Sequence, residues 1–299
     1  MPVDIDGILL LDKPLHMSSA GAVARAKRLF DARKAGHTGA LDPLASGLLP
    51  VCFGEATKFG SHMLDADKTY RVTARFGERT ASADLESAVI ERRTLPALTA
   101  PQVAAALAEF PRGYLQVPPM HSAIKQEGKP LYEYARAGLT RSREPRRIDI
   151  HAMTLIEWRS PDLQFEVRCS KGAYIRVLAE DIAARMGTIA HLIELRRLGV
   201  APFRSEPQWS FEDLDALDSA RRQRLLLPVD AALGAWRRFD LPAGGVVALR
   251  QGQSIPVPDT VPGAVRIYAA GFGFLGLGEI RASGRLVPLR LISAAANRA

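Results

Sequence analysis

The pattern of apolar residues changes near residue 238. Before this point, segments of strand and helix character follow one another without strict alternation, which favours an α+β fold over a doubly wound one. From Leu241 to Ile292, short apolar runs are separated by Gly and Pro, as is typical of a small β-barrel or sandwich. We therefore expect a large α+β domain over residues 1–238 and a small β domain over residues 239–299.

Local patterns predict several single elements. Residues 68–76 alternate between apolar and polar from Tyr70 to Phe76, which predicts a half-buried strand. The runs Gly7–Leu11 and Phe165–Cys169 predict two further strands. Helices are predicted to start at Ser18 or Ser19, at Thr99-Ala-Pro101, after the turn Ser170-Lys171-Gly172 and at Ser210 with Asp213, and C-terminal strands at Val265–Ala269, Phe274–Ile280 and Leu286–Leu291.

The charge balance indicates a polyanionic partner. The chain has 40 Lys and Arg against 32 Asp and Glu, a formal net charge of +8. Phosphates attract such a surplus, because each neutralised phosphate releases counterions. A simple basic protein with no such partner remains an alternative at this point.

The cysteines and the hydrophobic stretches exclude some classes. Cys52 and Cys169 are far apart and are not spaced as metal ligands, so we expect neither a disulfide framework nor a metal site. The N-terminal apolar run is short and flanked by acidic residues, unlike a signal peptide. No stretch approaches the length of a membrane span. We expect a cytoplasmic protein that does not enter a membrane.

The segment GHTGALDPLASGLLP, residues 36–50, is the richest in chemical possibilities. It lacks the Gly-Lys-Ser/Thr sequence of a phosphate-binding loop. Pro43 restricts Asp42 to extended conformations, and Gly39 and Gly47 permit close approach of a backbone or ligand. We expect residues 35–54 to form a rigid loop that presents one carboxylate. By spacing alone, a tight turn in which Asp42 bonds to its own backbone is the better interpretation.

Residues 113–147 are rich in Pro, Gly, Arg and Tyr and look like an excursion from the core. Basic groups interleaved with aromatic rings suit an insertion that grips RNA. A solvated charged loop is the alternative, since most charge runs are exposed faces. The residues concerned are Lys125, Lys129, Arg136, Arg141, Arg143, Arg146 and Arg147, with Tyr132 and Tyr134.

Several motifs, in order along the chain, resemble one known family. GHTGALDPLASGLLP resembles the catalytic motif of the TruB family, the bacterial tRNA pseudouridine-55 synthases. The resemblance covers most of residues 5–205, while the C-terminal part is similar more loosely. Its other motifs are LLLDKPLHMSS (9–19), GEATKF with the following KTYRV (54–72), PPMHSAIKQEGKPLYEYARAG (118–138), CSKGAYIR (169–176) and HLIELRRLGV (191–200).

The resemblance implies a fold and a reaction. The fold is an α+β pseudouridine-synthase domain with a mixed, largely antiparallel sheet and an RNA-gripping insertion, followed by a small PUA-like β-barrel that contacts tRNA. The reaction is the isomerisation of uridine 55 in the T arm of tRNA, without cofactor or metal, on a base flipped out of the stack. We expect a monomer.

The resemblance also assigns roles to residues. It implies that Asp42 is the catalytic carboxylate, and that Arg176 and Tyr70 act beside it. Burial raises the pKa of a carboxyl group, so a nearby cation is needed, and a guanidinium suits a bidentate pair. Without the resemblance, Arg176 equally fits a snorkelling residue at a helix start, and Tyr70 fits the core.

Further residues are implied around this centre. Tyr174 would contact the nucleotide, and Leu195 would form the floor beneath the base, although its pattern alone predicts core. His37 would fill the space left by the flipped base, although without the resemblance a loop histidine that caps a turn is the better interpretation. Lys13 and Pro14 would support the pocket. Ser46 replaces a frequent threonine, and His121 departs from a common tyrosine, so its role stays open.

Three rival functions compete with this interpretation. The same isomerase could act on another RNA stem-loop. A non-enzymatic tRNA-folding or RNA-binding factor would need the basic insertion but not Asp42, Tyr70 and Arg176 together. A phosphohydrolase ranks last, because the sequence shows neither a metal cluster nor a phosphate-loop lysine.

Overall fold

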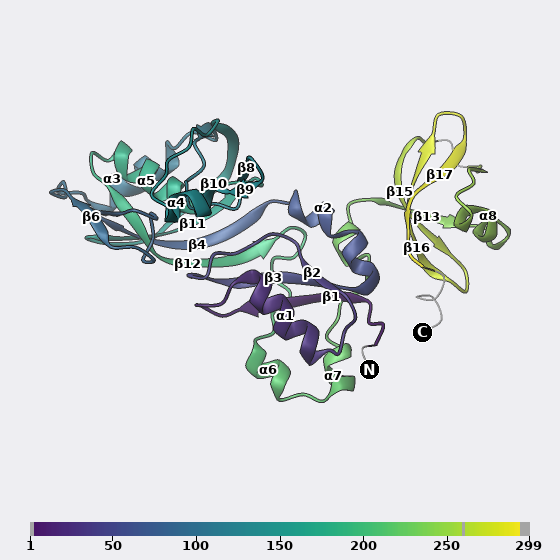
Figure 1. Ribbon diagram of the computed structural model, residues 1–299. Helices are drawn as coiled ribbons and strands as arrows, with labels where there is room; N and C mark the ends of the chain where they lie inside the picture. Colours follow the sequence, from purple (N-terminus) through teal and green to yellow (C-terminus); the bar gives the residue numbers. More distant parts are fainter. Residues whose placement is uncertain (1–2, 259–260, 294–299) are drawn as a thin grey trace.

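Two lobes make up the computed structural model of the chain, which describes residues 3–258 and 261–293. The larger lobe is built on an eight-stranded sheet and the smaller on a five-stranded sheet. Figure 1 shows the smaller lobe to one side of the larger, beyond helix α2 (Gly60–Leu64). No helix in the described ranges is long and apolar enough to cross a membrane.

The large sheet is mixed and largely antiparallel, as predicted. Its order is β1-β3-β12-β4-β11-β10-β7, with β2 also paired to β3. The pairing of β12 with β3 is parallel, whereas the other neighbours in this order run antiparallel. The strands are β1 (Gly7–Lys13), β2 (Ala35–His37), β3 (Ala45–Phe53), β4 (Lys68–Phe76), β7 (Gly113–Gln116), β10 (Arg146–Arg159), β11 (Asp162–Cys169) and β12 (Ala190–Val200).

Alternation along β4 explains how this sheet builds its core. Tyr70, Val72, Ala74 and Phe76 are buried, whereas Arg71 on the opposite face is exposed. The buried face packs under α5 (Ile175–Arg185), which presents apolar side chains to the sheet. The predicted half-buried strand is confirmed, because its buried apolar side chains follow the period of two that a pleated strand imposes.

Three of the four predicted helix starts are confirmed by side-chain caps, and α5 begins after the predicted turn without one. Ser18 caps α1 (Ser19–Leu29) by accepting a hydrogen bond from the N–H of Gly21. Thr99 and Ser210 each begin a helix with a reciprocal capping box. The remaining helices are α3 (Ala100–Ala108), α4 (Leu131–Arg136), α6 (Phe211–Asp215), α7 (Ser219–Gln223), α8 (Val246–Arg250) and the 3₁₀ helices η1 (Gly54–Lys58), η2 (Ala231–Leu233) and η3 (Ala243–Gly245).

The prediction that residues 35–54 form a loop is wrong for most of the segment. Residues 35–37 form β2, and residues 45–53 form β3, which is almost entirely buried. The strand pairs with β1 on one side and with both β2 and β12 on the other. Pro50 lies between the stretches that pair with β12 and β2, where a missing N–H is tolerated. Only residues 38–44 are loop.

The basic segment leaves the large sheet and returns to it. Strand β7 pairs with the first residues of β10, and residues 117–145, here called the insertion, lie between them. The insertion contains a short hairpin followed by α4 (Figure 1). The hairpin strands are β8 (Lys125–Gln126) and β9 (Lys129–Pro130), and a separate two-stranded sheet pairs β5 (Glu78–Thr80) with β6 (Val89–Arg92).

The smaller lobe is a β structure, and the three predicted C-terminal strands are confirmed within it. Its sheet has the order β13-β15-β16-β17-β14, with β13 and β14 at the two ends, which makes it an open half-barrel. It packs on the larger lobe through a cluster of Phe59, Leu233, Leu277 and Ile292. The strands are β13 (Arg237–Leu241), β14 (Ile255–Pro256), β15 (Gly263–Ala269), β16 (Gly273–Arg281) and β17 (Arg285–Leu291).

Candidate active site

The segment that carries Asp42, residues 38–44, joins β2 to β3 and is called the Asp42 loop below. The buried hydroxyl of Ser19 accepts a hydrogen bond from the N–H of Leu41 at 2.7 Å and donates one to the Leu41 carbonyl at 3.0 Å. The N–H of Ala45 donates to the Asp42 carbonyl at 3.0 Å. Helix α1 and strand β3 therefore hold the backbone on both sides of Asp42.

The carboxylate of Asp42 forms an ion pair with Arg176. Nε of Arg176 lies 3.0 Å from Oδ2 of Asp42 and 3.6 Å from Oδ2 of the buried Asp84. Nη1 donates to the Ser82 carbonyl at 3.0 Å, and Nη2 donates to the His121 carbonyl at 2.8 Å. The guanidinium is thus held by two carboxylates and by two carbonyls, one of which belongs to the insertion.

These contacts correct two expectations about Arg176. Its side chain is 7% exposed, so it is not a snorkelling residue. The pair with Asp42 uses Nε, because both Nη atoms donate to carbonyl oxygens. The Asp42 side chain is 45% exposed, which leaves the carboxylate accessible to a substrate while the cation beside it is buried.

A cavity opens beside this ion pair. Its volume is about 110 Å³, whereas a single water needs only about 10–15 Å³ by the same kind of measure. A smaller pocket of about 10 Å³ adjoins Asp42 and Arg176 on the side of Asp84. The residues that line the larger cavity are Ala40, Leu41, Asp42, Tyr70, Ala173, Tyr174, Ile175, Arg176 and Leu195.

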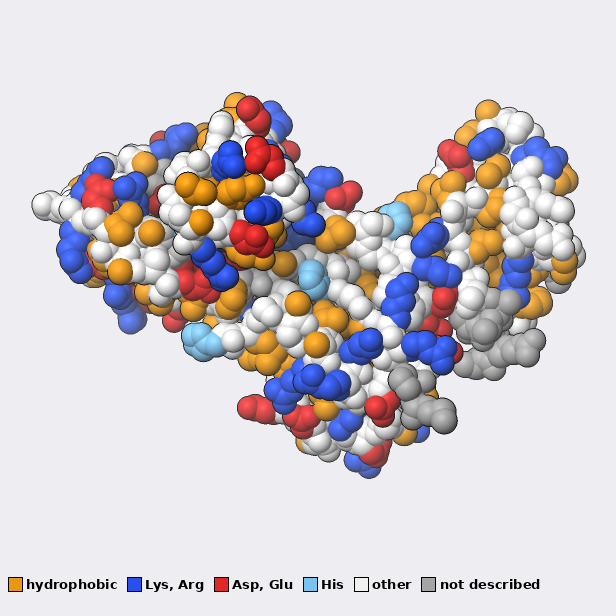
Figure 2. All heavy atoms as spheres, viewed as in Figure 1, with side chains coloured by type: hydrophobic (Ala, Val, Ile, Leu, Met, Phe, Trp, Pro, Cys, Tyr) orange, Lys and Arg blue, Asp and Glu red, His pale blue; other side chains and the backbone are white. Residues whose placement is uncertain are grey.

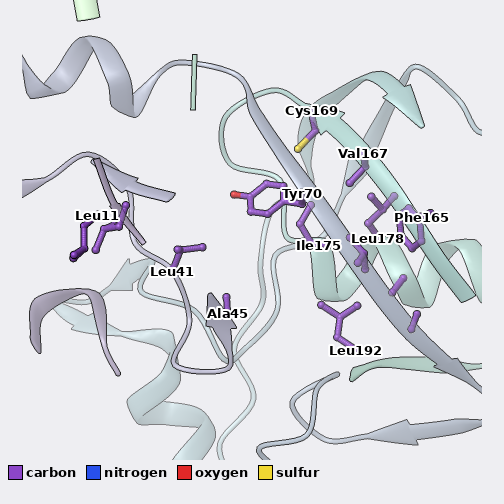
Figure 3. Packing of buried hydrophobic residues seen from close by; sticks show 14 of the residues in the cluster. Leu11, Leu41, Ala45, Tyr70, Phe165, Val167, Cys169, Ile175, Leu178 and Leu192 are labelled. Atoms are coloured by element: carbon purple, nitrogen blue, oxygen red, sulfur yellow. The ribbon is translucent and has the colours of Figure 1, made fainter. Parts of the chain in front are cut away.

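Tyr70 belongs both to the core and to the cavity. Its ring packs on the buried face of β4, and Figure 3 shows its hydroxyl pointing to the side where Leu41 of the Asp42 loop lies. Burial raises the pKa of the Tyr70 hydroxyl, while the guanidinium of Arg197 opposes this effect. At neutral pH the group is therefore a phenol that can donate a proton.

Tyr174 and Leu195 reach the cavity from two different elements. Tyr174 caps the N-terminus of α5, where Gln116 of β7 accepts from its N–H at 2.8 Å and donates to its carbonyl at 3.1 Å. Leu195 of β12 is paired with Ala45 on one side and Val72 on the other. The sheet register thus places Leu195 beside the Asp42 loop, as an apolar wall of the cavity.

His37 and Lys13 lie next to the loop but do not belong to the cavity lining that the structure describes. Nδ1 of His37 accepts from the N–H of Gly39 at 3.3 Å, the contact expected of a loop histidine that caps a turn. Lys13 is completely buried, and its Nζ donates to the carbonyls of Pro14 and Met17 at 2.8 and 2.7 Å. These bonds join the end of β1 to the start of α1.

In the insertion, two arginine guanidinium groups lie over tyrosine rings of the same segment. The Arg136 guanidinium lies 5.3 Å from the centre of the Tyr132 ring, and that of Arg141 lies 4.6 Å from the centre of Tyr134. Arg141 also pairs with Glu127 at 3.1 Å, so part of its charge is neutralised within the insertion. The exposed cations between β7 and the start of β10 are Lys125, Lys129, Arg136, Arg146 and Arg147.

Three buried residues of the site were missed in the sequence. Asp84 and Gln116 had no signal, because each is an isolated polar residue in an irregular or short segment. Arg197 had a signal: in β12 it alternates with Arg196, so one of the two must face inward. Arg197 is 1% exposed, whereas Arg196 pairs with Asp12 on the opposite face.

The face of the molecule in Figure 2 is concave. The larger lobe is hollowed between its upper and lower parts, and a broader recess lies between the two lobes. Within the described ranges, no group of three or more His, Cys, Asp or Glu side chains is placed to hold a metal ion.

Comparison with solved structures finds the same fold in two Cbf5 complexes. The chain superposes on a Cbf5 structure, described as a Cbf5–Nop10–Gar1 complex, with a TM-score of 0.71 and 23% identity over 96% of this chain and 84% of that one. An archaeal Nop10–Cbf5 complex gives a TM-score of 0.70 and 22% identity over 97% and 86%. At these identities the similarity shows a shared fold.

The particular family follows from the sequence comparisons. Residues 27–175 match the N-terminal domain of TruB family pseudouridylate synthases, and two C-terminal domain types of the same enzymes match residues 176–234 and 239–292. Proteins named tRNA pseudouridine synthase B are 49% identical in Burkholderia mallei (strain NCTC 10247), over 96% of this chain and 97% of that one, and 47% identical in Sodalis glossinidius (strain morsitans), over 97% and 96%. The chain belongs to the TruB family of pseudouridylate synthases, which are isomerases.

Proposed function

We propose that this protein isomerises uridine 55 in the T loop of tRNA to pseudouridine, in the cytoplasm, as a monomer without cofactor or metal. The single observation that carries the proposal is the Asp42–Arg176 ion pair on the wall of a cavity shared with Tyr70 and Leu195. The relatives named tRNA pseudouridine synthase B support the same reaction and substrate. We also propose a division near residue 238, with the C-terminal lobe touching other parts of the tRNA.

The chemistry requires a carboxylate next to the sugar of a flipped nucleotide. The C1′–N1 bond of uridine breaks, the uracil turns, a C1′–C5 bond forms, and the proton on C5 is lost while N1 gains one. Asp42 is suited to attack the nucleotide covalently or to stabilise positive charge at C1′. Its exposed carboxylate meets the substrate, and the buried Arg176 keeps the negative charge in place.

The other cavity residues hold the base. The ring of Tyr70 offers a stacking face, and its hydroxyl is suited to accept or relay a proton during the isomerisation. Leu195 supplies an apolar floor, and Tyr174 contacts the nucleotide from the N-terminus of α5. Because His37 lies outside the cavity lining, its proposed place is in the duplex space that the flipped base leaves.

The insertion is proposed to grip the T arm. Its exposed Lys125, Lys129 and Arg136 can follow phosphates, and the ring of Tyr132 beside Arg136 offers a stacking face. Arg141 is a weaker candidate, because Glu127 already pairs with it. The surplus of positive charge over the whole chain supports the same partner.

The test is incubation of the purified protein with an unmodified tRNA transcript, followed by nucleoside analysis of the T loop. We expect one pseudouridine per tRNA at position 55 and none in a transcript that carries cytidine there. Product at another position would contradict the proposed site, and no product would contradict the isomerase. A protein with Asp42→Asn that binds tRNA and restores a deletion phenotype would support the RNA-folding alternative.

A further inference from the structure

Arg197 lies buried beneath the Asp42 loop and binds the backbone on both sides of Asp42. Its Nη2 donates to the Gly39 carbonyl at 3.1 Å, and its Nη1 lies 3.4 Å from the Ala40 carbonyl. Its Nε donates to the Leu48 carbonyl in β3 at 2.7 Å. One planar guanidinium therefore joins the residues that precede Asp42 to the strand that follows it.

Both glycines flanking the Asp42 loop face Arg197. A Cβ atom on Gly47 would lie 2.2 Å from the Arg197 carbonyl oxygen, and the φ of Gly47 is +100°. A Cβ on Gly39 would lie 3.9 Å from Nη1 of the same arginine, and its φ is +124°. Both glycines therefore lie close to the same residue: Gly47 approaches the backbone of Arg197, and Gly39 approaches its side chain.

Arg197 also lies directly opposite Tyr70 in the pairing of β12 with β4, and its charge opposes the effect of burial, which raises the pKa of the Tyr70 hydroxyl. Its charge also lowers the pKa of His37, Lys13 and Lys68, so the guanidinium affects several ionisable groups around the Asp42 loop. Burying a charge costs free energy that carbonyl partners only partly return, and an apolar side chain of similar volume serves stability as well or better. A role beyond stability is needed to account for an arginine here.

We propose that Arg197 is a positioning residue, which holds the Asp42 loop and the Tyr70 hydroxyl at the separation that the proposed isomerisation requires. The inference rests on the function proposed above. Arg197 is not itself one of the residues that line the cavity, but it contacts two that are, Ala40 and Tyr70. It acts through Asp42 and Tyr70, so its loss affects the chemical step rather than the binding of tRNA.

The experiment compares Arg197→Lys, Arg197→Met and the neighbouring Arg196→Met. Lysine keeps the charge but not the planar fork of donors, and methionine removes both. Arg196 is the matched control, because it occupies the next position of β12 and pairs with Asp12 on the opposite face. Thermal unfolding, tRNA affinity and single-turnover pseudouridine formation are measured for each protein.

We expect both Arg197 variants to bind tRNA like the wild type and to form pseudouridine roughly 100-fold more slowly under single-turnover conditions, the effect of a misplacement of about 1 Å. Arg196→Met should keep the wild-type rate. A wild-type rate in folded Arg197→Lys would overturn the inference, as would a loss of rate matched by an equal loss of tRNA affinity.

A second measurement keeps the inference testable if Arg197→Met folds poorly. The pKa of His37 is lowered by burial and then by the Arg197 charge, so an NMR titration of the imidazole reports where that charge lies. We expect Arg197→Lys, whose ammonium cannot reach both carbonyls, to shift the His37 pKa while Arg196→Met leaves it unchanged. An unchanged His37 pKa in Arg197→Lys would show that the Arg197 charge does not lie against the Asp42 loop. A wild-type protein that makes no pseudouridine would instead count against the proposed function.

Discussion

The two buried arginines at the site, Arg176 and Arg197, and the arginines of the insertion lie in opposite environments. Arg176 and Arg197 are buried, and their guanidinium groups bond to carbonyls and carboxylates of elements far apart in the chain. Arg136 and Arg141 belong to a short segment of hairpin and helix, where they contact aromatic rings of the same segment. The first pair organises protein atoms, and the second leaves charge on the surface.

This difference separates the residues that fix the positions of the catalytic groups from those that contribute affinity for tRNA. A buried guanidinium with several partners fixes positions, because moving it would leave carbonyls and a charge unsatisfied. An exposed cation has little to hold it but can exchange counterions for phosphate. Substitution of the buried arginines should therefore alter the rate of pseudouridine formation or the stability of the protein. Substitutions in the insertion should alter tRNA binding and its salt dependence.

The largest effect should come from Asp42→Asn. We expect pseudouridine formation to fall roughly 10⁴-fold or more, because the amide cannot act as a nucleophile or carry negative charge. Affinity for tRNA should stay near that of the wild type. Asp162→Asn is the control, since Asp162 pairs with Arg75 on the outer face of the sheet. Residual turnover near the wild-type rate would remove Asp42 from the mechanism, and with it the contrast between a site that controls rate and an insertion that controls binding.

The next effect concerns Gly47→Ala compared with Gly128→Ala. Both glycines have positive φ, but only Gly47 has the backbone of Arg197 within 2.2 Å of an added Cβ, and Gly128 has open space. We expect the first change to lower the free energy of unfolding by about 3 kcal/mol or more and the second by about 1 kcal/mol. Chemical denaturation measures both values, and equal losses would show that the Asp42 loop is no more tightly packed than the insertion.

A smaller effect is expected from the triple change Lys125→Ala, Lys129→Ala and Arg136→Ala. Loss of each phosphate contact reduces the slope of log affinity against log salt by about 0.7–0.9 and weakens binding. We expect roughly 10-fold weaker tRNA binding at moderate salt, with an unchanged rate at saturating enzyme. Arg92→Ala with Arg159→Ala, at exposed ion pairs elsewhere, is the control. An unchanged salt slope would remove the insertion from the RNA interface.

The smallest effect is a pH dependence of stability at the buried lysine Lys13. Burial lowers its pKa from 10.5 to about 8, although the charge of Asp42 opposes this. Between these values the unfolded chain binds more protons than the folded one, so this residue makes stability rise with pH. As the pH rises from about 8 to 10.5, we expect the free energy of unfolding of the wild type to increase by about 1–2 kcal/mol relative to that of Lys13→Met. The exposed Lys27→Met controls for loss of one lysine, and a constant or falling difference would contradict a buried charge.

Much of the fold could be predicted, because its signals are local. The alternation of β4, the caps at Ser18, Thr99 and Ser210, and the C-terminal strands are each visible within a few residues. The prediction failed for β3, where glycine and proline suggested a loop. Those residues are accommodated there because β3 has different partners along its length, which no local pattern reveals.

The site was predictable only where motifs carried it. Asp42, Tyr70, Tyr174, Arg176 and Leu195 do line one cavity, as the family resemblance implies, but their individual roles stay predictions. The sequence offered no reason to select Asp84 or Gln116, and only a weak one to select Arg197. A buried polar residue is recognised by its partners, and those partners come from distant strands and helices.

By itself the sequence determined the local conformations: period-two burial in strands, capped helix starts, a proline-restricted Asp42 and a basic insertion. Only the tertiary structure decided which of these parts meet. The register that pairs Gly47 with Arg197, and the packing of α5 on β4, bring one carboxylate, two guanidinium groups and one phenol together. Such pairings depend on hydrogen bonds and burial between segments far apart in the chain, and therefore form only when the whole sheet does.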